Sequence, residues 1–349
     1  MLTDIFAERY SGTLMWESFT DSEAKLLMQC YRILSEQLFR PYTLDGKLDE
    51  ANQAVWKKLH SQLSRELGVK ELACGWYSTS KNLDGSPHIQ FWTAETQCEY
   101  FLCARYTGTS ADAWIKERLS LVELAFRSKA EAIASENSTL ASRVQEMGRR
   151  FPSGLRSPRL PGGPGEGMRA SNAQINEAFH AAAEELNVRL QRAGTRLTYH
   201  NGFLQISSDQ LIATIVEQPF WALLDQAKWK NVDIDMKEAL DRRDTGGRDP
   251  AFYAAKAVES VIKIVSDEKG WTHGKETGAH GYIDNLSARK NGGFIDAWEA
   301  VSLKAFFSSV RNSQGHGPGS APMPTLTPQQ TDWAIEFCMC WTKSLIQRL

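Results

Sequence analysis

Cysteine is scarce in this chain, and its spacing matches no disulfide framework. The six cysteines are spread over the whole sequence, without the regular spacing of small secreted scaffolds: Cys30, Cys74, Cys98, Cys103, Cys338 and Cys340. Scattered thiols of this kind are typical of proteins that stay reduced in a cytoplasm. The sequence therefore predicts a cytoplasmic protein without structural disulfides.

Long apolar runs and an excess of charge are also missing. No stretch approaches the roughly 20 apolar residues that a membrane-spanning helix needs, and the first ten residues carry Asp4 and Glu8 instead of a basic leader. The net charge is −2, so any nucleic-acid site must be a local basic patch. The composition that remains, 42% hydrophobic and 23% charged over 349 residues, is typical of a folded protein with two domains.

The hydrophobic pattern is mostly helical. Apolar residues recur at helical spacing in five long segments: 21–38, 112–136, 172–193, 250–269 and 328–345. Four of these segments begin with residues that cap a helix: Thr20-Asp21-Ser22-Glu23, Ser171-Asn172-Ala173-Gln174, Asp249-Pro250 and Thr327-Pro328-Gln329-Gln330. Asn201-Gly202 between apolar alternations predicts a β-hairpin, and strands are also expected near 74–78 and 88–93. We predict a mostly α fold, with an N-terminal helical domain and a C-terminal helical bundle with a small β-hairpin.

Residues 152–167 interrupt the helical pattern. Their sequence, PSGLRSPRLPGGPGEG, holds four prolines and five glycines, which argue against a helix or a strand. This predicts four regions: an N-terminal domain (1–148), a linker (149–170), a connecting region (171–248) and a C-terminal domain (249–349). The linker region is rich in arginine, including Arg149, Arg150, Arg156 and Arg159. These side chains either belong to a solvated linker or form a basic arm that contacts RNA.

The segment Arg311-Asn312-Ser313-Gln314-Gly315-His316 holds the groups needed to cut RNA without a metal. RNA carries its own nucleophile, the 2′-hydroxyl. His316 can accept or donate a proton near neutral pH, Arg311 can stabilise charge on the phosphate, and Asn312 can position the phosphate or the histidine. One histidine cannot easily perform both proton transfers, so two copies of the chain facing each other would complete the site.

Other interpretations of these residues stay open. Arg311 could cap the carbonyl end of the preceding helix, and His316 could be an ordinary loop residue. Glu259 and Lys256 lie three residues apart on one face of the predicted 250–269 helix. They either support Arg311 or form a surface ion pair.

A zinc site is the other chemistry that the sequence raises. His273 and His280 lie in a Gly-rich loop, and Cys338 and Cys340 follow near the C-terminus. A Cys-x-Cys pair on a helix points its thiols about 200° apart, and the spacings match no usual zinc template. We therefore expect no metal or other cofactor. The loop could instead shape the RNA entrance, and His273 or His280 could supply a second proton carrier.

Several segments resemble known families. DPAFYAAKAVESVIKIV (249–265) and SVRNSQGHG (309–317) resemble the abortive-infection C-terminal branch of the HEPN superfamily, the higher eukaryotes and prokaryotes nucleotide-binding domains. The ribonuclease motif of that superfamily is Arg, a polar residue and then His, with four to six residues between Arg and His. Arg311, Asn312 and His316 match it with four. TDIFAERY, WKKLHSQLSREL, YHNGFLQI and PFWALL are similar to AbiJ-like abortive-infection proteins.

The resemblance implies a dimeric, metal-independent endoribonuclease that acts as a toxin in anti-phage defence. Arg311, Asn312 and His316 would be its catalytic residues, and the substrate would be RNA, with transfer RNA and messenger RNA both open. The N-terminal domain would sense a trigger or bind a regulatory partner, and an antitoxin or accessory protein is a further expected partner. The alternative is a non-catalytic HEPN module that binds RNA, a nucleotide or a protein.

Overall fold

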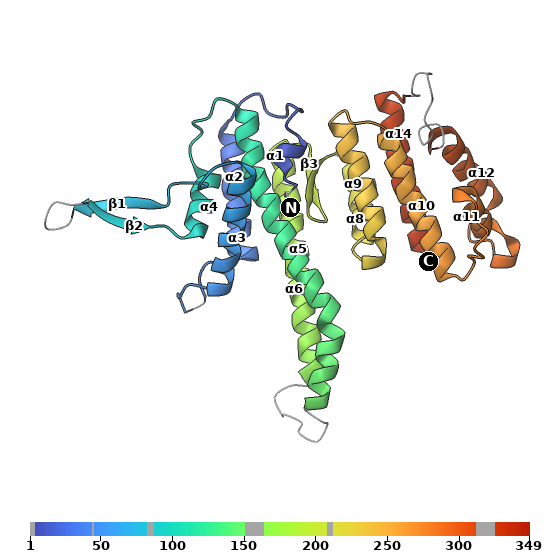
Figure 1. The fold of residues 1–349 in the computed structure, drawn as a ribbon, viewed down its shortest axis with the longest axis horizontal. Helices are drawn as coiled ribbons and strands as arrows, with labels where there is room; N and C mark the ends of the chain where they lie inside the picture. Colours follow the sequence, from blue (N-terminus) through green and yellow to red (C-terminus); the bar gives the residue numbers. More distant parts are fainter. Residues whose placement is uncertain (1–3, 44, 82–86, 151–163, 208–211, 312–324) are drawn as a thin grey trace. The chain divides into compact units, whose positions relative to one another are not determined.

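The computed structural model describes residues 4–43, 45–81, 87–150, 164–207, 212–311 and 325–349. The chain divides into two compact units, unit 1 (Met1–Leu204) and unit 2 (Gln205–Leu349) (Figure 1). The predicted mostly α fold is confirmed, because helices dominate both units and the strands of the described residues form only two small hairpins. Among the helices of these residues, none contains an apolar stretch that could span a bilayer.

Unit 1 is built around one long helical pair. Its helices are, in chain order, α1 (Phe6–Arg9), α2 (Asp21–Ile33), the π-helical turn η1 (Leu34–Leu38), α3 (Glu50–Glu66), α4 (Ala94–Cys103), α5 (Ala111–Arg150) and α6 (Pro164–Arg192). Helices α1, α2, α3 and α6 all pack against α5. The apolar stripe predicted for 112–136 is confirmed, since Leu119, Val122 and Phe126 are fully buried. The capping box at Thr20 is confirmed as well.

The helical pair extends further than the sequence pattern indicated. Helix α5 continues to Arg150 and α6 begins at Pro164, so the expectation of a non-helical stretch up to residue 167 is wrong at its end. Ser171 consequently lies inside α6 and does not cap it. A proline in the first turn is preorganised for a helix, which explains this start. The predicted 149–170 linker thus connects two helices of the same unit.

Polar contacts replace the apolar stripe in the outer part of this pair. The Asn137 Oδ1 accepts hydrogen bonds from the side-chain amides of Asn172 and Asn176, at 2.8 and 3.1 Å. The α5 side chains around them are mostly exposed. A helix without a buried face has no apolar period, so periodicity could not detect the C-terminal part of α5.

The predicted hairpin and the two expected strands are present. Strand β1 (Trp76–Lys81) pairs antiparallel with β2 (Pro87–Phe91), close to the strands expected at 74–78 and 88–93. Strands β3 (Leu197–His200) and β4 (Phe203–Ile206) flank the predicted Asn201-Gly202 turn. The φ angles of these two residues are 41° and 89°. Positive φ at both positions is what a type I′ turn requires, and Asn-Gly supplies it at low cost.

Unit 2 is a helical bundle around α10. Its helical elements are η2 (Ala213–Glu217), α8 (Gln218–Leu223), η3 (Ala227–Trp229), α9 (Lys230–Asp244), α10 (Pro250–Glu268), α11 (Gly278–Ser287), η4 (Arg289–Asn291), α12 (Ala297–Phe306), the π-helical turn η5 (Phe307–Arg311) and α14 (Pro328–Arg348). Helices α9, α11 and α14 and the turn η5 all pack against α10. This central position explains why α10 carries small and apolar residues on most of its surface.

The last helix buries a different face from the one expected. The sequence predicted a core stripe of Trp333, Phe337, Trp341 and Leu345, but only Leu345 is fully buried and Trp333 is exposed. The neighbouring stripe, which includes Cys338 and Met339, lies in the core instead. Trp333 and Phe337 pack against Phe306 at the edge of the core, with the Phe306 and Phe337 ring centroids 4.7 Å apart. Because α14 has two apolar stripes, the pattern alone did not decide between them.

Candidate functional site

Arg311 is the last residue of η5, where α12 loosens into a π-helical turn. Such turns are rare in proteins, and those that occur are often found at functional sites. The Arg311 Nη2 donates a hydrogen bond to Glu259 Oε2 of α10 at 3.0 Å, and its guanidinium carbon lies 5.7 Å from the centroid of the Phe252 ring. The structure therefore brings together Arg311 and Glu259, which the sequence paired. The predicted C-terminal cap of the preceding helix is not needed to explain the orientation of this arginine.

Several predicted site residues fall outside the described residues. Asn312 and His316 lie in 312–324, directly after Arg311, and Arg156 and Arg159 lie in 151–163. Arg149 and Arg150 end helix α5, but their side chains are also outside the description. Their predicted roles in catalysis and RNA binding stay predictions.

Lys256 contacts a different acid from the one that the sequence suggested. Its Nζ lies 2.8 Å from Asp235 Oδ1 of α9. Lys263 pairs with Glu259 in its place, with 2.9 Å between Lys263 Nζ and Glu259 Oε1. The physical reason is the geometry of α10, because Lys256 projects toward α9 and Lys263 lies one turn after Glu259. A Glu followed by Lys at i,i+4 is a favourable pair on a helix, so the spacing of Glu259 and Lys263 is the local signal for this contact.

Glu259 is thus a buried carboxylate that holds two basic side chains. It is 7% exposed, and each of its oxygens engages one cation. Charge-assisted hydrogen bonds of this kind fix the direction of an arginine. Two positive charges against one negative charge leave the cluster with a net positive charge. The arrangement suits the binding of a phosphate.

A histidine borders the same turn. His280 of α11 has its Nε2 3.3 Å from both the Lys304 carbonyl oxygen and the Ser308 Oγ. Ser308 belongs to η5 and precedes Arg311 by three residues. Of the two loop histidines, His280 is therefore the one with a contact to the Arg311 turn. Its use as a second proton carrier stays a prediction.

The other loop histidine belongs to a fixed turn. The His273 backbone N–H donates to Glu276 Oε1 at 2.7 Å. This hydrogen bond, with a second from the Asn285 side chain, lowers the pKa of Glu276 to about 2.

The two cysteines that raised the question of a zinc site lie in different surroundings, because Cys338 is buried in the core whereas Cys340 is exposed. The described part of the chain contains no cluster of three metal-binding side chains.

A cavity of about 470 Å³ opens near the first turn of α10. Three arginines from the last turn of α9 and the α9–α10 connection line it, Arg242, Arg243 and Arg248. Each has an acidic neighbour: Arg242 lies 2.6 Å from Glu238, Arg243 lies 2.8 Å from Asp244, and Arg248 lies 3.2 Å from Asp249. Because these charges are compensated, the cavity is not a strongly basic pocket.

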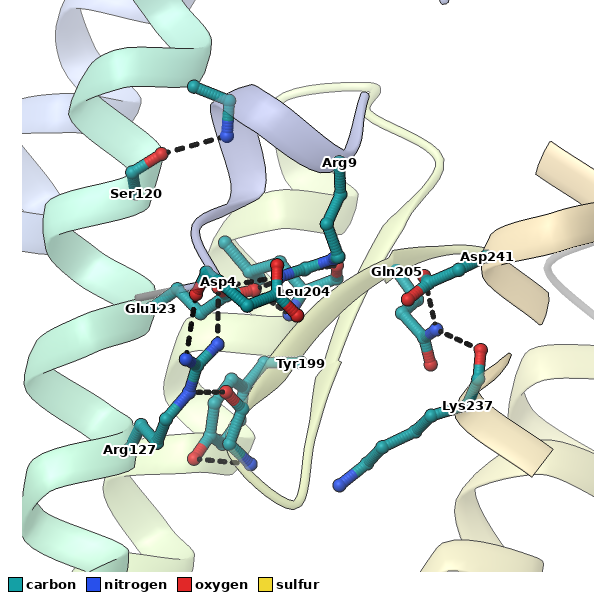
Figure 2. A network of polar contacts seen from close by, with 12 residues as sticks. Asp4, Arg9, Ser120, Glu123, Arg127, Tyr199, Leu204, Gln205, Lys237 and Asp241 are labelled. Atoms are coloured by element: carbon teal, nitrogen blue, oxygen red, sulfur yellow. Dashed lines mark hydrogen bonds and ion pairs between the residues drawn. The ribbon is translucent and has the colours of Figure 1, made fainter. Parts of the chain in front are cut away.

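Unit 1 contains a second carboxylate that holds two basic residues (Figure 2). Glu123 of α5 is fully buried and binds Arg9 Nη2 at 2.6 Å and Arg127 Nη2 at 2.7 Å. Its Oε2 also accepts the backbone N–H of Leu204 at 2.7 Å. Arg127 in turn donates to the Gly202 carbonyl oxygen at 3.0 Å and to the Asp4 carbonyl oxygen at 2.8 Å. Glu123 therefore ties the N-terminal segment and the β3–β4 turn to α5.

The family model for AbiJ N-terminal domain 4 matches residues 4–222. The chain belongs to this family. The match contains WKKLHSQLSREL, YHNGFLQI and all but the first residue of TDIFAERY, and it ends within PFWALL. It also contains the whole Glu123 network, so the AbiJ part of the resemblance is confirmed. Membership of an AbiJ family links the protein to abortive-infection systems.

The match also has a clear limit. It ends at residue 222, before α10, so it does not reach Arg311, and the HEPN-like interpretation of 249–349 stays a prediction. No curated protein matches the chain, and no solved structure matches it. The match runs continuously across the predicted 149–170 linker.

Proposed function

We propose that this AbiJ-family protein is a metal-independent endoribonuclease toxin of an anti-phage abortive-infection system. The observation that carries the proposal is the Arg311–Glu259 ion pair, 3.0 Å long, at the turn that leads directly into Asn312 and His316. A buried acid orients the arginine, and the Arg311 side chain remains about one-third exposed. It is therefore fixed in direction and still able to bind a phosphate.

The reaction would use the chemistry of RNA itself. The 2′-oxygen attacks the adjacent phosphorus while the bond from phosphorus to the 5′-oxygen breaks. The proton of the 2′-hydroxyl passes to a base, and the leaving 5′-oxygen takes a proton from an acid. Arg311 would stabilise the negative charge on the phosphate, Asn312 would position it, and His316 would transfer a proton. The products are a 2′,3′-cyclic phosphate and a 5′-hydroxyl.

A homodimer would supply the second proton carrier. One His316 can act as base while the His316 of the partner copy acts as acid, in a site shared across a two-fold axis. The substrate would be cellular RNA in the cytoplasm, either transfer RNA or messenger RNA. Unit 1 would sense the trigger or bind an antitoxin or accessory protein. Light scattering should give a mass near twice 39.2 kDa, and a monomer that cuts RNA would contradict the shared site.

The test of the function separates catalysis from binding. Wild-type protein and His316→Ala are incubated with total RNA in excess EDTA, and the product ends are mapped. The exposed His180 of α6 provides a matched control as His180→Ala. We expect cyclic phosphate ends from the wild type and the control, and a loss of about 10²–10⁴-fold in His316→Ala. RNA binding without cleavage in all three proteins would favour a non-catalytic HEPN module instead.

A further inference from the structure

Five side chains of unit 2 form a continuous strip that starts and ends on an aromatic ring. The Arg311 guanidinium lies 5.7 Å from the Phe252 ring centroid and 3.0 Å from Glu259. On the other side of Glu259, the Lys263 Nζ lies at 2.9 Å from the carboxylate and 5.8 Å from the Tyr282 ring centroid. The order along the strip is aromatic, cation, acid, cation, aromatic.

Three packed elements build this strip. Phe252, Glu259 and Lys263 lie on α10 at positions i, i+7 and i+11, which fall on one face of a helix. Arg311 comes from η5 and Tyr282 from α11, and both elements pack against α10. The strip therefore rests on regular secondary structure, which holds a binding surface more rigidly than a loop would.

The charges of the strip suit two neighbouring phosphates. Because the two oxygens of one carboxylate hold them, the two cations lie within about 8 Å of each other. Glu259 is buried, whereas the Lys263 side chain is 44% exposed. The acid therefore holds both cations from the buried side, while the Lys263 and Arg311 side chains stay 44% and 31% exposed. A single-stranded nucleic acid offers phosphates at short regular intervals and bases that can stack on aromatic rings.

We propose that this strip binds single-stranded RNA, with Lys263 and Tyr282 as positioning residues. Lys263 takes the phosphate next to the one at Arg311, and Phe252 and Tyr282 stack on the flanking bases. The assignment of the Arg311 phosphate as the one that is cut rests on the proposed ribonuclease function. Duplex RNA is excluded as the ligand of the whole strip, because its paired bases do not expose faces for stacking.

Binding to an RNA that cannot be cut tests the strip separately from catalysis. The probe is a fluorescein-labelled single-stranded RNA with 2′-O-methyl riboses, whose blocked 2′-oxygens cannot attack. The full-length wild type, Lys263→Gln and Tyr282→Leu are compared by fluorescence anisotropy. Lys228→Gln is the matched control, because Lys228 also pairs with a glutamate, Glu268 at 2.9 Å, beside an aromatic ring, that of Trp229 at 4.8 Å.

We expect Tyr282→Leu to weaken binding by roughly 5- to 150-fold, the range for loss of one stacked base. For Lys263→Gln the slope of log K against log salt should fall by about 0.7, the contribution of one phosphate contact on a single strand. Lys228→Gln should match the wild type. Thermal unfolding identifies any variant that has lost its fold. If Tyr282→Leu does not fold, the salt dependence of the surface substitution Lys263→Gln alone tests the strip.

The outcomes distinguish this inference from the proposed function. Cleavage that depends on His316, together with wild-type binding in Lys263→Gln and Tyr282→Leu, overturns the strip and leaves the ribonuclease standing. Weaker binding in both variants of a protein that never cuts RNA supports the strip and overturns the ribonuclease. A wild type that fails to bind the probe, or that binds a duplex of the same sequence more tightly, overturns the strip.

Discussion

Glu123 in unit 1 and Glu259 in unit 2 are both buried carboxylates that hold two basic side chains, but the surroundings of those cations differ. Around Glu123 the cations are mostly covered as well, with Arg9 and Arg127 side chains 9% and 18% exposed. They also donate to backbone carbonyl groups of Leu204 and Gly202. Around Glu259 the Arg311 and Lys263 side chains are 31% and 44% exposed.

The difference indicates two uses for the same chemistry. A network whose charges and donors are satisfied inside the protein holds segments together, and removal of one member leaves an uncompensated buried charge. A pair of cations fixed from below by one acid, and open above, can exchange part of its interaction for a ligand phosphate. We therefore expect mutations at Glu123 to affect stability and mutations around Glu259 to affect RNA.

Within the comparison of the two carboxylates, the largest expected effect is the loss of RNA cleavage in Arg311→Ala. Loss of a positioned donor that stabilises transition-state charge should reduce the cleavage rate about 10²–10³-fold, with little change in thermal stability. Arg32→Ala is the matched control, because Arg32 is an exposed arginine paired with Glu36 at 2.8 Å. Cleavage assays with gel-resolved products measure the effect. An unchanged cleavage rate in Arg311→Ala would contradict a catalytic role for Arg311 and thus for the Glu259 cluster of unit 2.

The next effect is on folding. Glu123→Gln removes the carboxylate partner of Arg127 and leaves Arg9 with only the exposed Asp4, at 3.1 Å, so the free energy of unfolding should fall by about 3 kcal/mol. Glu259→Gln should cost less than about 1 kcal/mol, since its cations can turn to solvent. Urea unfolding of both variants, followed by circular dichroism, checks this. Equal losses of unfolding free energy in the two variants would contradict the view that the Glu123 network stabilises the fold more than the Glu259 network does.

A third buried carboxylate, Glu217, sharpens the comparison through pH. Burial raises the pKa of Glu217 to about 7, and the hydrogen bond from Ser207 and the charge of Arg243 oppose this only in part. The folded protein then holds a proton that the unfolded chain releases near pH 4.5. This stabilisation is complete below that pH and is lost as the pH rises through about 7.

The free energy of unfolding should therefore decrease with rising pH between about 5 and 7, by at most about 1.4 kcal/mol per pH unit from this group. Glu217→Gln cannot titrate and should remove that part of the slope. Urea unfolding at pH 5, 6, 7 and 8 compares the variant with the wild type. Parallel curves for the two proteins would show that Glu217 is already ionised in the folded state.

The smallest expected effect concerns the arginines near the end of α5. Changing Arg149, Arg150, Arg156 and Arg159 to serine should flatten the salt dependence of RNA binding if they contact phosphates, by about 0.7 in slope for each contact. The 2′-O-methyl RNA probe and anisotropy titrations from low to high salt measure it. A slope equal to that of the wild type would assign these residues to a solvated connection.

The sequence predicted the parts of the fold whose signals are local. The Thr20 and Thr327 capping boxes and the Asn201-Gly202 turn act within a few residues, so they are readable without the rest of the chain. The polar pairing of Asn137 with α6 and the choice between the two stripes of α14 depend on partners far along the chain. Local pattern holds no information on those partners.

The same limit applies to the site. The opposite charges of Glu259 and Arg311 predicted their contact from the sequence, although 52 positions separate them. Lys256 was assigned to the same group by spacing, but Asp235 of α9 attracts it. The packing of the bundle determines which face of α10 lies against η5 and which lies against α9. That packing is why Lys263, and not Lys256, pairs with Glu259.

The π-helical turn η5 has a consequence for helical register. A π-turn accommodates one residue more than an α-turn, which shifts every later residue by about 100° around the axis. Removal of one residue from 307–310 would let the chain return to a regular α-helix. The arginine would then point roughly a quarter-turn away from Glu259 without any change in its identity. The number of residues in η5 therefore sets the direction of the Arg311 side chain. Deletion of one of them should abolish the Arg311–Glu259 contact while the rest of the fold stays intact.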